Sequence, residues 1–188
     1  MIRAWTKWME KRISNSNFFI DMYELYYKNV VKNEIRLARV EDKDNILCIG
    51  GGAVPCTALQ MAMETGAKVH VIDIDPIAVY NAKNLINKKG LSHRIQVSNK
   101  NGQEIDIRDY DVIHVALQVS PKEKVLENLW KKARKGTKIV VRMPKKGLNY
   151  FYSSLSCGFL ETNDINCERC SAKKGINTMD RTLLMVKN

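Results

Sequence analysis

The sequence predicts an α/β protein with a Rossmann-like, doubly wound, mainly parallel sheet, an antiparallel C-terminal edge hairpin and preceding N-terminal helices. Between residues 45 and 143, short apolar runs rich in Val and Ile alternate with helical stretches. Such alternation specifies parallel strands with crossover helices on both faces of the sheet. Beyond residue 143, two apolar runs are joined by a short polar loop, which predicts the hairpin.

The N-terminal part of the chain predicts helices. Residues 3–12 place Trp5, Trp8 and Met9 on one helical face, and the polar run SNSN at 14–17 ends this pattern. A longer helical stretch follows from Phe18 to about Arg39. We therefore divide the chain into an N-terminal helical segment, residues 1–40, and a Rossmann-like domain, residues 41–188.

The elements of the domain follow from local signals in the sequence. Apolar, β-branched runs predict strands at 45–50, 68–75, 94–98, 109–117 and 137–143. Helices are predicted at 55–66, 76–90 and 120–136, each with a proline near its start and a glycine near its end. A short helix at 147–156 and hairpin strands at 164–172 and 182–188 complete the prediction.

Composition excludes several classes of protein. The 188 residues, 45% of them hydrophobic, suffice for one sizeable core. No apolar run is long enough to span a membrane, and the N-terminus does not resemble a secretory signal. The odd number of cysteines, five, in a chain of this size predicts a reduced protein of the cytoplasm.

Charge and cysteine spacing raise two further questions. The net charge of +11 permits a nucleic-acid partner, but the basic residues are dispersed and do not favour one. Cys167 and Cys170, with Cys157 upstream, give three sulfurs, whereas structural zinc takes four ligands. We predict no metal site and leave the role of these cysteines open.

A run of three glycines, Gly50, Gly51 and Gly52, follows the first predicted strand. Loops at this edge of a doubly wound sheet bind ligands, and glycine lets backbone N–H groups face them. A strand-to-helix turn needs one glycine at positive φ, so three suggest close approach of a ligand. No lysine of a triphosphate loop follows, and Pro55 stands where a dinucleotide loop has its third glycine.

The loop and its surroundings resemble the S-adenosylmethionine-dependent methyltransferase superfamily. The string Ile72-Asp73-Ile74-Asp75-Pro76 looks like that family's second motif, in which Asp73 would bind the ribose hydroxyls and Ile74 would lie beside it. Asp75 reads as a helix N-cap. By the same resemblance, Asn101 would contact adenine with Gly102 beside it, and Ala116 and Leu117, together with Gln118, would line the site under the methionine moiety.

One branch of the superfamily fits better. The sequence has Cys48 where methyltransferases usually carry an acid, and Val54 where they have a further glycine. The string CIGGGAVPCT is similar to the loop of nicotianamine synthase-like proteins, roughly x-I-G-[SG]-G-P-L-P-L-T. Those enzymes move the aminocarboxypropyl arm of S-adenosylmethionine, and the resemblance implies that Tyr27 and Glu34 face the active site. Family members also carry a longer N-terminal helical region with a catalytic glutamate, most of which precedes this sequence.

The sequence therefore predicts an enzyme, an S-adenosylmethionine-dependent methyltransferase acting on a small molecule, since methyl transfer dominates the superfamily. The first alternative is nicotianamine synthase-like aminocarboxypropyl transfer. An RNA methyltransferase and a non-catalytic cofactor-binding subunit are further alternatives. His114 and Tyr26 are weaker candidates for the site, each read first as a packing residue. A homo-oligomer or a partner subunit remains open.

Overall fold

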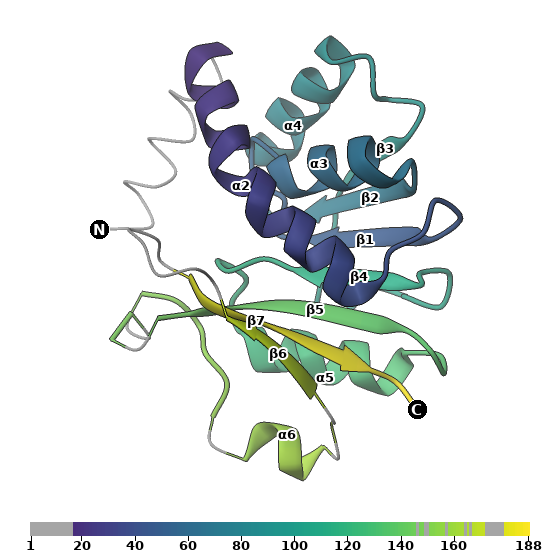
Figure 1. The fold of residues 1–188 in the computed structure, drawn as a ribbon, viewed down its shortest axis with the longest axis vertical. Coiled ribbons are helices and arrows are strands. Elements are labelled where there is room, and N and C mark those ends of the chain that lie inside the picture. The colour runs from purple at the N-terminus through teal and green to yellow at the C-terminus, as the bar shows by residue number, and fades with distance from the viewer. Residues whose placement is uncertain are drawn as a thin grey trace.

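A seven-stranded sheet forms the centre of the protein (Figure 1). The structure, a computed structural model, describes residues 17–145, 147, 148, 151–156, 158–163, 165, 167–171 and 179–188. The predicted helix at 3–12 lies outside the described residues. In chain order the elements are α2 (Asn17–Ala38), β1 (Asn45–Ile49), α3 (Cys56–Thr65), β2 (Lys68–Asp73), α4 (Pro76–Lys88), β3 (Ile95–Asn99), β4 (Val112–Val115), α5 (Lys122–Lys132), β5 (Lys138–Pro144), α6 (Phe159–Thr162), β6 (Cys167–Ser171) and β7 (Met179–Val186).

The strand order is β3-β2-β1-β4-β5-β7-β6. The five strands from β3 to β5 are parallel, and β7 pairs antiparallel with both β5 and β6. This confirms the predicted mainly parallel sheet with an antiparallel hairpin. The chain order reverses between β1 and β4, so a crevice for a ligand is expected at the carboxyl ends of these two strands.

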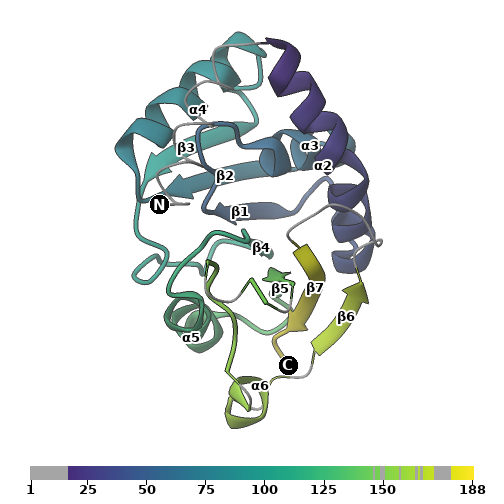
Figure 2. The same cartoon turned by 90° about the vertical axis from the view of Figure 1, so that its left-hand side faces the viewer.

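Helices cover both faces of the sheet (Figure 2). Alternate residues of each strand face opposite sides, which divides the apolar core into two clusters. Ile46 and Cys48 of β1 pack on the side of α2, α3 and α4, and Leu47 and Ile49 pack on the side of α5. The doubly wound architecture thus follows from strands that are apolar on both faces.

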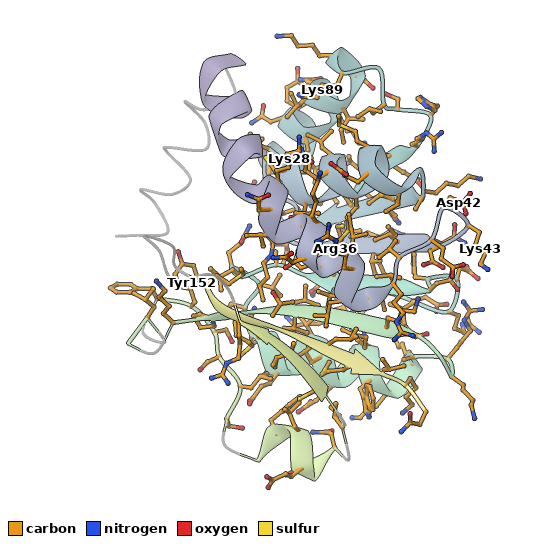
Figure 3. The ribbon with its side chains drawn as sticks, viewed as in Figure 1. Lys28, Arg36, Asp42, Lys43, Lys89 and Tyr152 are labelled. Atoms are coloured by element: carbon orange, nitrogen blue, oxygen red, sulfur yellow. The ribbon has the colours of Figure 1, made fainter. Side chains whose placement is uncertain are left out.

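The long helix α2 packs onto this sheet with its C-terminal half. Val31, Glu34 and Ala38, spaced at three and four residues, are buried, whereas Lys28 and Arg36 are exposed on the same helix (Figure 3). The helix contacts α3, β5 and β7. The last turns of the predicted N-terminal segment therefore pack against β5 of the sheet. The domain division at residue 40 stays a prediction.

One predicted element differs from the structure. No helix forms in the described part of 147–156, where the chain makes turns after β5, and the short helix α6 lies at 159–162 instead. Gly158, in the left-handed conformation, precedes this helix, and Phe159 is buried against the α5 side of the core. A single buried aromatic side chain anchors the segment, and so short an element leaves no periodicity in the sequence.

Candidate functional site

The three glycines form the turn between β1 and α3. Gly50 and Gly52 have φ values of 79° and 66°, a left-handed conformation that glycine adopts without strain. Gly51 needs the space, because a Cβ there would lie 2.1 Å from Val71 Cγ1. All three glycines therefore have a structural reason, and the premise that the turn needs only one is wrong. The loop still lies at the switch point, where a ligand is expected.

Asp73, the last residue of β2, holds this loop from the neighbouring strand. Its Oδ2 accepts a hydrogen bond of 2.8 Å from the N–H of Gly52, and its Oδ1 accepts one of 3.0 Å from the N–H of Asp75. An ionised carboxylate has about four acceptor sites, so each oxygen keeps a lone pair for a ligand. Asp75 caps α4 through Ile77 N–H, as the sequence predicted.

Three further residues of the predicted cofactor site follow the ends of β2 and β3. Ile74 directly follows Asp73, and its side chain is 69% exposed, as are other apolar side chains such as Ile77 at 63%. Asn101 lies in a turn in which its Oδ1 accepts a hydrogen bond from Gln103 N–H. Gly102 is buried against β1, where a Cβ would lie 2.8 Å from Ile49 Cγ2. Packing thus explains the glycine at position 102.

The end of β4 forms the opposite wall. Ala116 and Leu117 are buried, and their carbonyl oxygens accept hydrogen bonds of 3.0 and 3.2 Å from Lys122 Nζ. Gln118 Nε2 donates to Gly50 O at 3.2 Å and so joins this wall to the glycine loop. Sequence reasoning missed Lys122, because a lysine in the run KEK predicts a solvated side chain.

A buried ionic cluster lies on the α2 face of β4 and β5. Arg142 of β5 donates to both carboxylate oxygens of Glu34, with Nε–Oε1 and Nη2–Oε2 distances of 2.8 and 2.7 Å. Thr182 of β7 donates to Glu34 Oε1 at 3.2 Å, and His114 Nε2 lies 3.4 Å from Oε2 without hydrogen-bond geometry. The candidate Glu34 is thus the centre of an ion pair.

Burial and charge set the protonation of this cluster. Burial raises the pKa of Glu34, but the Arg142 guanidinium outweighs it, and the pKa lies far below its usual range. Burial lowers the pKa of His114, which is neutral at pH 7. Burial likewise raises the pKa of Cys48 to about 12, so that its thiol keeps its proton. The Glu34 carboxylate is therefore ionised and paired with Arg142. A carboxylate with so low a pKa accepts a proton poorly and is unsuited to act as a general base.

Two cavities flank the sheet. A small one of about 40 Å³ lies beside the glycine loop and is lined by Gly51, His114 and Arg142 among others. A larger one, about 760 Å³, lies at the amino ends of β1, β2 and β3, away from the loop. We place the site at the smaller cavity, because ligands of doubly wound sheets bind at the carboxyl ends of the strands.

Four of the tyrosine and cysteine residues considered in the sequence analysis have side chains outside the described part of the structure. Tyr26 and Tyr27 lie on α2, but their side chains are outside the described part, as are Cys157 and the side chain of Cys170. Within the described residues, no group of three His, Cys, Asp or Glu side chains could hold a metal ion. None of the described helices has the length and apolar character to cross a membrane.

Comparison with known proteins identifies related sequences. The family model described as nicotianamine synthase protein matches residues 17–166. L-histidine 2-aminobutanoyltransferase of Yersinia pestis is 30% identical over 159 residues, which cover 84% of this chain and 57% of that enzyme. The chain thus spans just over half the length of this relative.

Solved structures agree in fold. A mutant of MtNAS in complex with S-adenosylmethionine superposes with a TM-score of 0.79 at 21% identity, covering 95% of this chain and 70% of that one. MtNAS in complex with MTA and tNA gives a TM-score of 0.75 at 22% identity, covering 95% and 68%. The match of the family model over most of the sequence identifies the family. The chain belongs to the nicotianamine synthase protein family.

Proposed function

We propose that this protein binds S-adenosylmethionine and transfers its aminocarboxypropyl arm, the amino-acid end of the molecule, to the amine of a small acceptor. The observation that carries the proposal is the glycine loop tied to Asp73 within a chain of the nicotianamine synthase family. The relative in Yersinia pestis, named for aminobutanoyl transfer to L-histidine, supports this over methyl transfer, which the sequence placed first.

The adenosine half of the ligand would lie at the carboxyl ends of β1, β2 and β3. The free lone pairs of the Asp73 carboxylate would accept hydrogen bonds from the ribose hydroxyls, and the exposed Ile74 would pack on the adenine ring. Asn101, in the turn after β3, would contact the adenine edge. The sulfonium would then lie between the glycine loop and the Ala116–Leu117 end of β4.

The chemistry needs little from the protein beyond positioning, since the sulfonium is already an activated leaving group. The acceptor amine attacks the carbon of the aminocarboxypropyl arm that is bonded to sulfur. A carbon–nitrogen bond forms, the carbon–sulfur bond breaks, and its electron pair neutralises the sulfonium to give methylthioadenosine. The proton that the amine loses passes to a base or to water.

The cluster around Glu34 would hold α2 in place over the site, and it would not accept the proton that the amine loses. Its carboxylate is committed to Arg142, and the neutral His114 lies against the cavity beside the loop. Tyr27 remains the proposed catalytic residue on α2. We infer the acceptor class, an amino acid or a similar small amine, from the relative's name. An RNA acceptor is supported only by the net charge of +11. No feature of the described residues supports a non-catalytic role.

The nucleoside product tests this proposal. The protein is incubated with S-adenosylmethionine and L-histidine, with other amino acids as parallel acceptors, and the nucleosides are separated by chromatography. Methylthioadenosine that appears only with an acceptor supports aminocarboxypropyl transfer. S-adenosylhomocysteine would instead support methyl transfer. Tight binding of S-adenosylmethionine with neither product, for any acceptor, would favour a cofactor-binding subunit.

A further inference from the structure

Lys122, at the start of α5, is the one charged side chain with no exposed surface among the described residues. Its Nζ donates to two backbone carbonyls, Ala116 O at 3.0 Å and Leu117 O at 3.2 Å, and no carboxylate in the described part of the chain forms an ion pair with it. Burying an ammonium without a carboxylate is costly. The two hydrogen bonds offset part of this cost and tie the side chain to the backbone that carries the carbonyls.

The two carbonyls belong to the turn that follows β4. Ala116 O also accepts a hydrogen bond from Val119 N–H, so Lys122 closes a compact turn. The backbone N–H of Lys122 donates to Ser153 Oγ at 2.9 Å, which fixes the start of α5 to the segment after β5. Lys122 is therefore held at both its backbone and its side chain.

This turn packs directly on the glycine loop. A Cβ at Gly50 would lie 2.7 Å from Val119 Cγ2 and 3.5 Å from Ala116 Cβ, so the two segments are in van der Waals contact. Gln118 Nε2 adds a hydrogen bond to Gly50 O. A shift of the turn would change the width of the crevice between β1 and β4, where the sulfonium is proposed to lie.

We propose that Lys122 is a positioning residue of the S-adenosylmethionine site, whose ammonium holds the turn after β4 against the glycine loop. The inference rests on the proposed function, because it concerns the same site. Lys122 touches no ligand and acts through the carbonyls of Ala116 and Leu117.

The protonation of Lys122 should make the affinity for the ligand depend on pH. Burial lowers the pKa of Lys122 to about 7, and a neutral amine makes weaker hydrogen bonds to the two carbonyls than an ammonium does. On β4, His114 senses the Lys122 charge, but burial keeps the pKa of His114 below its ordinary 6.5. On α5 itself, the Glu123 carboxylate accepts a hydrogen bond from Ser156 N–H. Affinity for the ligand should therefore fall as Lys122 loses its proton.

The test compares Lys122→Met with Lys124→Met, an exposed lysine two residues further along the same helix. Binding of S-adenosylmethionine is measured by calorimetry between about pH 6 and about pH 9. We expect K122M to bind about tenfold more weakly than wild type at the low end and about threefold or less at the high end. K124M should follow wild type throughout. Ionisation of the ligand's own amine is common to all three proteins and cancels in the ratios.

The outcomes separate the two proposals. If wild type does not bind S-adenosylmethionine, the proposed function fails. If wild type binds and a folded K122M shows the same affinity and the same pH profile, the positioning role is overturned. Should K122M fail to fold, the binding of methylthioadenosine to wild type is measured over the same pH range, because this nucleoside lacks the aliphatic amine that titrates in S-adenosylmethionine. A loss of affinity centred near pH 7 supports the role of Lys122, and a flat profile overturns it.

Discussion

Arg142 and Glu34 form a two-bond ion pair in the interior of the protein, with N–O distances of 2.8 and 2.7 Å, although 108 residues separate them in the chain. The pair joins α2 to β5, and Thr182 of β7 adds a third hydrogen bond. Glu34 is 2% exposed and Arg142 is 4% exposed, so water could not solvate either charge if its partner were removed. The pair fixes the helix over the proposed site.

Replacing Arg142 by Met should therefore strongly destabilise the protein. The change leaves the Glu34 carboxylate buried without its cation, which costs about 3–5 kcal/mol. Urea unfolding followed by circular dichroism measures the loss. Arg134→Met is the matched control, because Arg134 pairs with Asp111 at 3.2 Å on the surface and should cost less than about 1 kcal/mol. Equal losses for the two variants would refute a buried, structural role for Arg142.

Lys122 makes stability depend on pH. Its pKa falls from the ordinary 10.5 to about 7 in the folded protein, so between these values the unfolded chain binds more protons. The free energy of unfolding should therefore rise with pH across this window, and this contribution should be absent below about pH 7. Unfolding curves of wild type, K122M and K124M measure it. The difference between wild type and K122M should change with pH, whereas a constant difference would contradict a buried, titrating lysine.

Asp73 should be required for binding S-adenosylmethionine, and a variant that lacks its carboxylate should still fold. Asp73→Asn removes the charge that would accept the ribose hydroxyls, and should weaken binding by about 1.5–3 kcal/mol. Asp75→Ala is the control, since Asp75 caps α4 and its loss costs about 1 kcal/mol of stability. Calorimetric titration of each folded variant gives the comparison. The ribose assignment is wrong if D73N binds as wild type does, or if D75A loses as much affinity.

The middle glycine of the loop should tolerate no side chain. A Cβ in Gly51→Ala would lie 2.1 Å from Val71 Cγ1, and the resulting strain should cost about 1–3 kcal/mol of stability. Val71→Ala removes the clashing methyl groups, so the double variant should be more stable than the sum of the two single effects predicts. Thermal unfolding of the three variants tests this. Additive effects would mean that the loop moves away from β2 without strain.

Much of the fold was predictable, because strands buried on both faces and helices bounded by Pro and Gly leave clear periodicities. The turn after β1 and the edge hairpin followed from such signals, whereas the role of Asp73 came from the resemblance to a family and stays a prediction. The Glu34–Arg142 pair did not, since nothing local shows which strand faces a helix so far away in the chain. The lone arginine within the apolar run KIVVRM was a signal that could have indicated a buried cation.

The burial of Lys122 could not be predicted, because its local sequence indicates the opposite. In the sequence it is one of two lysines around Glu123 at a helix start, where lysine is normally solvated. Only the path of the turn after β4 brings the Ala116 and Leu117 carbonyls within reach of its Nζ. The side chain of Tyr27 lies outside the described residues, so its catalytic role remains a prediction from resemblance.

The measurement that tests the central claim most directly follows a label from S-adenosylmethionine to the acceptor. The ligand is supplied in two forms, one labelled in the methyl group and one in the carboxyl group, with L-histidine as acceptor. We predict that the carboxyl label appears in the modified acceptor while the methyl label stays in the nucleoside. A methyl label in the acceptor, with the carboxyl label left on the nucleoside, would contradict aminocarboxypropyl transfer.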